Sequence, residues 1–311
     1  MSEPMNTTKK KRKFSLTDNL VWILLTGVVI IIAGELLGSV ITQKGIAVVL
    51  EALIPGASSS VVWRASRMYM GFIGTWIVAL LIMIVNPRNR PTLNTLTPKT
   101  KGNTLKRFVV GIAIGLGMNL LCAAIALANG DIVLSFNTFQ LGAFLYLSVA
   151  VLIQSAAEEL VCRVFIYQRM VRRYGKPVLA AVANAALFAL IHLANPGITF
   201  LAVLNIFIYG LLFSAIVVYM DSPWAAMGAH AAWNFCQNII LGLPNSGMVT
   251  PYSVFKLDAA TAVDSFAYSV NFGLESTITA SVTLMTVTVL IAWWGTKHKI
   301  VPTDIWNEGK E

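Results

Sequence analysis

Long apolar stretches, separated by short polar segments, dominate the pattern of this chain. A helix rises about 1.5 Å per residue, so about 20 apolar residues are needed to cross a hydrocarbon core of roughly 30 Å. Eight stretches are long enough, at residues 19–42, 68–86, 107–128, 138–167, 177–195, 198–219, 223–243 and 273–295. The pattern therefore predicts an all-α polytopic membrane protein with eight transmembrane helices.

These spans divide the chain into five parts. We expect a basic tail over 1–18, three transmembrane helices within 19–135, a four-helix core within 136–243, a polar loop over 244–272, and a last helix with its tail over 273–311. Composition agrees, because 57% of the residues are hydrophobic, only 12% are charged and the mean hydropathy is +0.72. Such values are typical of a membrane protein and not of a soluble domain.

The three cysteines change this picture little. Cys122, Cys162 and Cys236 lie far apart in apolar stretches, and no C-x-x-C motif is present. This spacing favours small buried apolar side chains over a disulfide framework or a cysteine metal site.

Positive charge distinguishes alternate connecting segments. With a cytoplasmic amino terminus, the inner segments carry eighteen Lys and Arg residues, including the run Lys9–Lys13, whereas the outer segments carry four. Because cytoplasmic loops are enriched in Lys and Arg, we expect both termini in the cytoplasm and the 244–272 loop outside. The inner charges are expected to face anionic lipid headgroups and not nucleic acid, with the protein in a bacterial plasma membrane.

The fourth apolar stretch contains an unusual cluster of charges, formed by Glu158, Glu159 and Arg163. An ionised side chain at the centre of a bilayer costs roughly 2.5–3.5 kcal/mol on insertion scales, and such residues are usually functional. The alternative is a structural ion-pair network that joins helices, since intramembrane charges often pair. Glu35, alone in the first stretch, has no motif around it and is expected to bond to a neighbouring helix.

Two histidines favour a site over a purely structural network. If Gly175 is the tip of a helical hairpin, Glu158 lies seventeen residues before it and His192 seventeen after it. Both would then stand about 25 Å from the tip, at one depth. His230 can reach the same depth if the hairpin protrudes into the cytoplasm. The spacing predicts a polar pocket within the bilayer, nearer its cytoplasmic side.

Helical spacing suggests a role for each side chain. Glu159 and Arg163 are four residues apart and can pair, which leaves Glu158 free for chemistry. His230 and Asn234 share one helix face and can donate hydrogen bonds to an oxyanion. A carboxylate beside imidazoles can activate water as a general base, and the target would then be an amide bond.

Three motifs in this region resemble those of a known family. Residues 158–163 match E-E-x-x-x-R, residues 188–192 match F-x-x-x-H and residues 230–234 match H-x-x-x-N. Their order on successive predicted helices is similar to that of the CPBP intramembrane proteases. That family includes the type II CAAX prenyl endopeptidases and the bacteriocin-processing or immunity proteins. The resemblance covers about a quarter of the chain, from Gln154 to Asn238.

The resemblance implies an intramembrane endopeptidase that faces the cytoplasm. Its substrate would be a membrane-associated peptide, with a prenylated CAAX-like carboxyl terminus or a hydrophobic leader. Glu158 would activate water beside His192, His230 and Asn234 would form the oxyanion site, and Glu159 and Arg163 would support them.

The sequence leaves alternatives open for both the cofactor and the function. The chain has no H-E-x-x-H motif, but Glu158, His192 and His230 are donor types that a Zn²⁺ shell uses, so a metal-dependent and a metal-free mechanism stay open. A proton-coupled transporter would also use intramembrane acids and histidines, although the chain shows no repeated halves. A catalytically idle immunity or scaffold protein would keep the fold without the reaction.

Overall fold

The computed structural model describes residues 15–306, so the predicted basic run Lys9–Lys13 lies outside the described part. Most of the described residues are helical. The elements are, in chain order, η1 (Leu16–Asp18), α1 (Leu20–Val40), η2 (Ile41–Ile46), α2 (Ala47–Leu53), η3 (Ala57–Ser59), α3 (Val61–Met70), α4 (Ile73–Val85), η4 (Arg90–Leu96), α5 (Leu105–Ala128), β1 (Leu134–Phe136), α6 (Leu141–Glu159), η5 (Leu160–Tyr167), α7 (Gln168–Tyr174), α8 (Pro177–Ile191), α9 (Phe200–Tyr219), α10 (Pro223–Asn234), η6 (Phe235–Ile240), β2 (Phe255–Leu257), η7 (Leu274–Ser276) and α11 (Ile278–Lys297).

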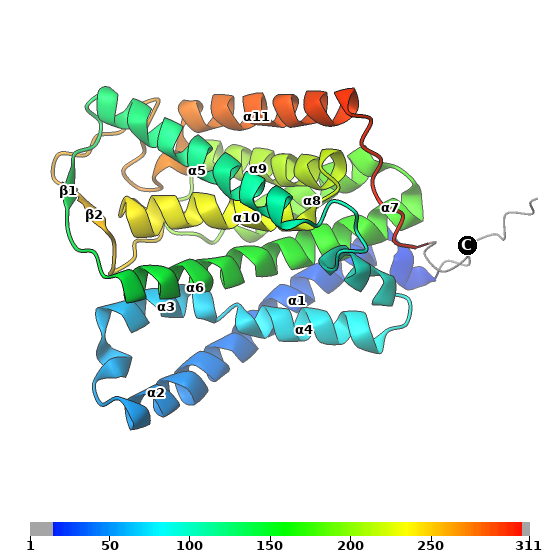
Figure 1. Ribbon diagram of the computed structural model, residues 1–311, viewed down its shortest axis with the longest axis horizontal. Helices are drawn as coiled ribbons and strands as arrows, with labels where there is room; N and C mark the ends of the chain where they lie inside the picture. Colours follow the sequence, from blue (N-terminus) through cyan, green and yellow to red (C-terminus); the bar gives the residue numbers. More distant parts are fainter. Residues whose placement is uncertain (1–14, 307–311) are drawn as a thin grey trace, which may run out of the picture.

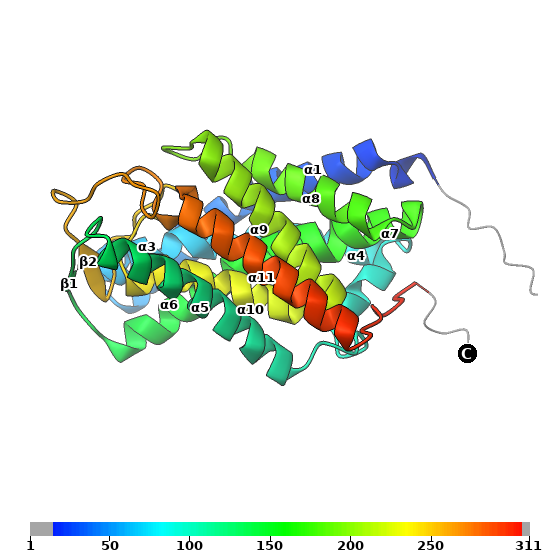
Figure 2. The same cartoon turned by 90° about the horizontal axis from the view of Figure 1, so that it is seen from above.

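The long helices run roughly along the longest axis of the molecule and form one bundle (Figure 1). In this view α11 lies along one side, α1 to α4 lie along the other, and α6 and α10 run between them. Seen from above, α9 and α11 cross over the bundle, and the described chain begins and ends at the end that carries α7 (Figure 2).

The predicted class, a helical membrane protein, agrees with the length and apolarity of the helices. Five helical segments within residues 15–306 are long and apolar enough to cross a membrane: Leu20–Leu53, Val61–Val85, Leu105–Ala128, Phe200–Tyr219 and Ile278–Lys297. The helices that carry the polar motifs, α6, α8 and α10, are not among these five. The predicted count of eight spans is therefore not confirmed.

A short sheet is the main departure from an all-helical fold. Strand β1 pairs antiparallel with β2, with Ser135 opposite Lys256. The sheet joins the connection before α6 to the loop between η6 and η7, so it ties two segments together at the end of the bundle away from α7 (Figure 1). The hydropathy pattern of the spans contains no signal for it.

Helices α5 and α10 approach each other closely because small residues face each other. A Cβ atom at Gly111 would lie 2.1 Å from the carbonyl oxygen of Ala225, and one at Gly115 would lie 2.0 Å from that of Ala229. Only glycine allows this separation of the two backbones, as in other helix pairs with the G-x-x-x-G spacing. The contact fixes α10, which carries His230 and Asn234.

The elements α6, η5 and α7 form one continuous helical rod from Leu141 to Tyr174. The rod ends at Gly175, whose φ of +63° is a left-handed conformation that glycine adopts without strain, and Pro177 opens α8. The predicted hairpin at Gly175 is confirmed. Among the described residues three segments are π-helical, and two of them, η5 and η6, begin directly after Glu159 and Asn234, whereas η2 continues α1. Such π-helical turns are frequent at functional sites.

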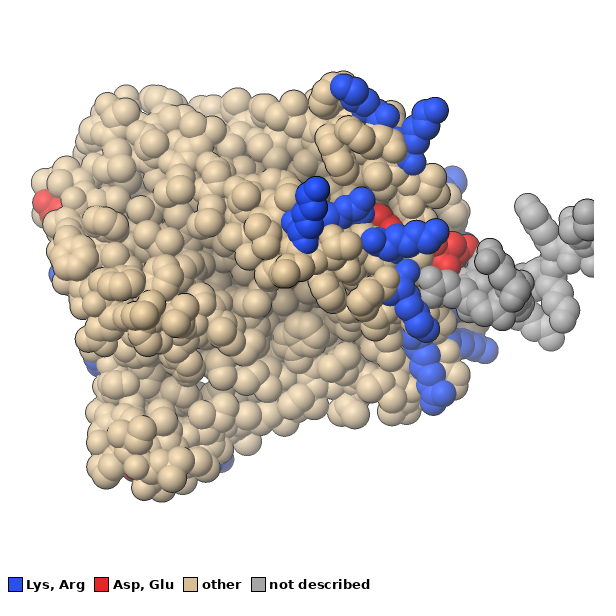
Figure 3. All heavy atoms as spheres, viewed as in Figure 1, with Lys and Arg blue, Asp and Glu red and all other residues tan. Residues whose placement is uncertain are grey.

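Charge is distributed unevenly over the visible surface. Lys and Arg side chains gather at the end of the bundle that carries α7, whereas the body is covered by uncharged residues (Figure 3). This agrees with the segregation of Lys and Arg along the sequence.

Candidate active site

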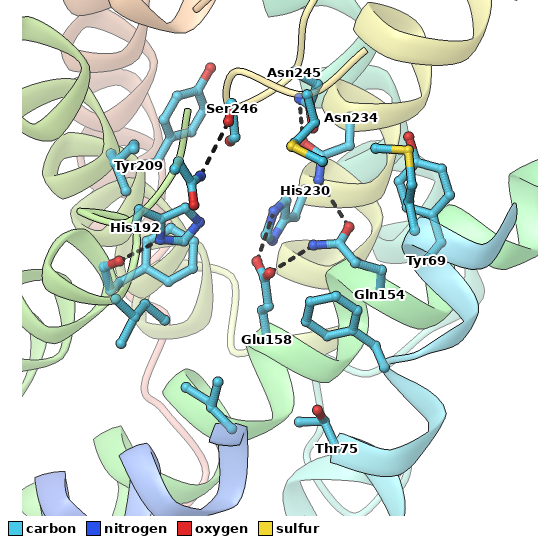
Figure 4. Close-up of a pocket in the computed structure, with 18 of the residues that line it drawn as sticks. Tyr69, Thr75, Gln154, Glu158, His192, Tyr209, His230, Asn234, Asn245 and Ser246 are labelled. Atoms are coloured by element: carbon cyan, nitrogen blue, oxygen red, sulfur yellow. Dashed lines mark hydrogen bonds and ion pairs between the residues drawn. The ribbon is translucent and has the colours of Figure 1, made fainter. Parts of the chain in front are cut away.

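The predicted polar pocket exists as a cavity of about 480 Å³. Helices α1, α3, α4, α6, α8, α9 and α10 contribute to its wall, together with the segments after α8 and η6. Four of the six predicted catalytic residues line it: Glu158, His192, His230 and Asn234 (Figure 4). Side chains from α6, α8 and α10 therefore meet around one space, as the spacing of the motifs predicts.

Glu158 projects from α6 into this cavity (Figure 4). Its Oε1 atom accepts a hydrogen bond of 2.7 Å from Nε2 of Gln154, one turn earlier on the same helix. Its Oε2 atom lies 3.5 Å from Nε2 of His230 and has no hydrogen-bond partner among residues 15–306. One carboxylate oxygen at the cavity wall is therefore buried without a hydrogen-bond partner.

Glu159 and Arg163 lie behind the cavity wall and are both fully buried, with exposed side-chain fractions of 0%. Nη1 of Arg163 lies 3.1 Å from Oε1 of Glu159, so the predicted pairing within the helix is present. The guanidinium also donates to the carbonyl oxygen of Gly210 at 3.0 Å, and it lies 4.9 Å and 5.3 Å from the ring centroids of Phe188 and Phe213. Pairing and the aromatic rings compensate for the burial of this charge.

His230 connects the buried pair to the cavity. Its Nδ1 atom lies 2.9 Å from Oε1 of Glu159, and its ring stacks on Phe213 with a centroid distance of 4.9 Å. Because an ionised carboxylate only accepts hydrogen bonds, this contact assigns a proton to Nδ1. The Nε2 atom is then directed at the cavity and at Glu158, so Glu159 fixes the orientation of the imidazole.

His192 lies at the end of α8, across the cavity from Glu158 (Figure 4). Its Nδ1 atom is 2.7 Å from the carbonyl oxygen of Phe188, and because a carbonyl only accepts, Nδ1 carries the proton. Nε2 then has a free lone pair, which can accept a hydrogen bond from water. The F-x-x-x-H motif thus supplies both the carbonyl that orients the imidazole and an aromatic ring packed against it.

Asn234 is buried on α10, one turn after His230. Its Nδ2 atom donates to Oε1 of Gln154 at 3.1 Å and to Oγ of Ser155 at 3.2 Å. Its Oδ1 atom accepts a hydrogen bond of 3.1 Å from Nδ2 of Asn245. The amide is therefore held at both ends, with its donor side toward α6.

Several lining residues were not identified from the sequence. Gln154 belongs to none of the three motifs, although its place four residues before Glu158 is a usable signal. Asn245, Ser246, Glu275 and Tyr209 also line the cavity, and nothing in their spacing relates them to the three motifs. Glu35 lines the cavity as well, from α1.

The donor types of a zinc shell are present, but they are not gathered. No group of three His, Cys, Asp or Glu side chains in the part of the chain that the structure describes is placed to hold a metal ion. Glu158 and His230 lie 3.5 Å apart, whereas the ring of His192 lies at the opposite wall of the cavity. In this arrangement Glu158, His192 and His230 do not fit a metal shell.

Fold and site together define a helical membrane protein with a carboxylate–imidazole cavity inside the bundle. Residues 140–236 match the family described as type II CAAX prenyl endopeptidase Rce1-like. The chain thus carries an Rce1-like domain over these residues, and the domain contains Glu158, Glu159, Arg163, His192, His230 and Asn234. The description is that of a membrane endopeptidase.

A curated relative gives no further assignment. The chain is 29% identical, over 173 residues and 52% of its length, to the "Uncharacterized protein YyaK" of Bacillus subtilis (strain 168). The match spans about half of that protein, 54% of its length. No solved structure matches the chain.

Proposed function

We propose that this protein is an intramembrane endopeptidase that hydrolyses a peptide bond in a membrane-associated peptide or protein. The observation that supports it most directly is the unpartnered Oε2 of Glu158, which faces His230 inside the cavity of an Rce1-like domain. The substrate class that the family description favours is a prenylated, CAAX-like carboxyl terminus. A hydrophobic leader peptide is the second substrate to test, although the comparisons give no support to a link with bacteriocins.

In this proposal Glu158 is the general base. A water molecule between Glu158 and the lone pair on Nε2 of His192 attacks the scissile carbonyl carbon, and its proton passes to Glu158. The carbonyl oxygen becomes an oxyanion, which accepts hydrogen bonds from Nδ2 of Asn234 and from the protonated Nε2 of His230. When the C–N bond breaks, Glu158 returns the proton to the leaving nitrogen. The immediate products are an amine and a carboxylic acid that keeps the second proton of the water, and transfer of this proton to the amine gives a carboxylate and an ammonium group.

Glu159 and Arg163 act on this reaction indirectly. Glu159 sets the direction of the His230 ring through Nδ1, and Arg163 compensates for the charge of Glu159 in the apolar interior. The proposed role of His230 uses both ring nitrogens, because Nδ1 contacts Glu159 and Nε2 faces Glu158 and the cavity.

We further propose eight membrane-spanning segments with both termini in the cytoplasm. The gathering of Lys and Arg at the α7 end supports this orientation (Figure 3). Glu158 lies midway along the Leu141–Tyr174 rod, and the segment that contributes Asn245 and Ser246 follows η6 at the opposite end (Figure 1). Asn245 and Ser246 thus lie toward the end opposite the basic α7 end, and they give no support to a cavity that opens at the basic end. A site that faces the cytoplasm stays a prediction.

Cleavage by the purified protein tests the proposal. The full chain in detergent is given fluorogenic prenylated peptides and leader peptides, and at least one is expected to be cut. Glu158→Gln should lower kcat by about 10²-fold or more, because a positioned general base contributes roughly 10²–10⁴-fold. Glu35→Gln is the matched control, since it removes another carboxylate from the cavity wall, and it should leave kcat within about threefold, well below the contribution of a general base.

Two outcomes would contradict the proposal. Cleavage that survives Glu158→Gln would remove Glu158 from the mechanism. Absence of cleavage together with substrate-driven proton uptake in vesicles would favour a proton-coupled transporter.

A further inference from the structure

A chain of side-chain hydrogen bonds joins two carboxylates across the cavity. From Glu275 it passes through Asn245, Asn234 and Gln154 to Glu158. The hydrogen-bonded atoms lie 3.2 Å apart between Glu275 and Asn245, 3.1 Å between Asn245 and Asn234, 3.1 Å between Asn234 and Gln154, and 2.7 Å between Gln154 and Glu158. Asn245 and Glu275 lie beyond residue 236, where the Rce1-like match ends.

The direction of this chain is fixed at its Glu275 end. An ionised carboxylate only accepts, so Asn245 must present its NH₂ group to Glu275. The second hydrogen of the same NH₂ group points to Oδ1 of Asn234. Asn234 is therefore turned with its own NH₂ group toward Gln154 and Ser155 on α6. The Glu158 end of the chain imposes the same direction, because Glu158 accepts from Nε2 of Gln154, and Oε1 of Gln154 then faces the NH₂ group of Asn234. Asn245 and Gln154 thus hold the Asn234 amide from its two ends.

The surrounding structure holds Glu275 firmly at this place. Oε2 of Glu275 accepts hydrogen bonds from the backbone N–H and the hydroxyl of Ser246, and its own carbonyl oxygen accepts one of 2.8 Å from Asn205. Gly273 has a φ of +82°, and a Cβ atom there would lie 2.1 Å from the carbonyl oxygen of Pro244. The segment before α11 is thus packed directly against the segment that carries Asn245.

We propose that Glu275 and Asn245 are positioning residues that hold the NH₂ group of Asn234 toward the reacting carbonyl. The inference rests on the proposed function, because the orientation matters only if Asn234 donates to an oxyanion. A substrate carbonyl would take the hydrogen bond that Gln154 accepts in the free protein. Glu275 is 5% exposed, so its contact with Asn245 is shielded from bulk water.

The kinetic test separates positioning from a structural role. Asn245→Leu keeps the approximate size of the side chain but removes the NH₂ group that donates to Oδ1 of Asn234. We expect kcat on the cleaved fluorogenic peptide to fall about tenfold or more, with KM within about threefold, because removal of an oxyanion donor costs roughly 10²–10³ in kcat. Asn137→Ala is the control. Asn137 donates to the carbonyl oxygen of Ser253, which lies in the same loop as Asn245, but Asn137 does not line the cavity.

A double-variant cycle adds a second kinetic criterion. If Asn245 acts through Asn234, Asn245→Ala should cause no further loss of kcat in the Asn234→Ala background. Fully additive losses, or a change in KM alone, would overturn the inference. Glu275→Gln gives a second variant if the Asn245 variants do not fold.

A measurement without substrate distinguishes failure of the inference from failure of the proposed function. In protein labelled with ¹⁵N-asparagine in micelles, the side-chain NH₂ signal of Asn234 is assigned by its loss in Asn234→Ala. It should shift in Asn245→Ala and in Glu275→Gln but not in Asn137→Ala. An unmoved signal would refute the orienting role whether or not any peptide is cleaved. A shifted signal in a protein that cleaves nothing would support the hydrogen-bond chain and contradict only the proposed function.

Discussion

His230 lies between two carboxylates, with Nδ1 at 2.9 Å from Oε1 of Glu159 and Nε2 at 3.5 Å from Oε2 of Glu158. The adjacent glutamates of α6 thus lie next to the two different ring nitrogens of one imidazole. Glu159 is fully buried and paired with Arg163, whereas Glu158 faces the cavity. The E-E pair therefore divides into a carboxylate that orients the ring and one that is available for chemistry.

Loss of Arg163 should destabilise the protein strongly. Arg163→Ala would leave Glu159 without the guanidinium that compensates for its charge, and removal of one partner of a buried pair typically costs about 3–5 kcal/mol. We expect a clear drop in the midpoint of thermal unfolding in detergent. Arg67→Ala, at an exposed position on α3, should leave the midpoint nearly unchanged. Equal midpoints for the two variants would show that the buried pair contributes little.

Chelation tests the role of metal. Because Glu158, His192 and His230 are not gathered as three ligands, we expect cleavage to persist in the presence of a strong zinc chelator. Loss of cleavage that Zn²⁺ alone restores would show that these side chains move together in the working enzyme. A catalytic zinc site usually has three protein ligands and an open position, so Glu158→Gln should then also lower the zinc content of the protein.

The sequence allowed the polar centre of the fold to be predicted because helical periodicity is a local property. The 158–163, 188–192 and 230–234 motifs each place two side chains one turn apart, and equal distances from Gly175 match the depths of Glu158 and His192. This arithmetic brings Glu158 and His192 to one depth, whereas the place of His230 in the same cavity depends on the packing of α10 against α5 and α6.

Other features depend on contacts between segments that are distant in the chain. Glu275 reaches the site through a loop whose path is set by Gly273 and by the pairing of β1 with β2, and no helical period encodes that path. The number of membrane crossings was also not settled by hydropathy. α6 carries the polar residues of the site, and α8 and α10 are only fifteen and twelve residues long.

Cysteine labelling tests the proposed orientation. Val249 is 62% exposed in the segment after η6, and the native cysteines Cys122, Cys162 and Cys236 are buried, which keeps background labelling low. In right-side-out vesicles, Val249→Cys should react with a membrane-impermeant maleimide. Lys297→Cys, at the end of α11, should react only after permeabilisation. The reverse pattern would invert the proposed topology, and equal reaction of both positions would contradict a membrane crossing by α11 between Val249 and Lys297.

The pH dependence of the Glu275 effect follows from the environment of this carboxyl group, which lies before α11. Burial raises the pKa of Glu275 from 4.5 to about 7, against the opposing effect of the hydrogen bonds from Ser246. Above this pH the ionised carboxylate only accepts and orients Asn245. Below it the protonated group can donate to Oδ1 of Asn245, which permits the opposite amide orientation. Glu275→Gln mimics the protonated form, since its amide can donate at every pH.

The ratio of kcat for the unsubstituted protein to kcat for Glu275→Gln should therefore be largest above pH 7 and approach one as the pH falls toward 5. His230 and Tyr209 are the titratable side chains that act electrostatically on Glu275, and both are present in the two proteins, as is Glu158. The ratio therefore reports on the carboxyl group of Glu275 itself. A ratio that stays constant between pH 5 and pH 8 would show that ionisation of Glu275 does not orient the Asn234 amide.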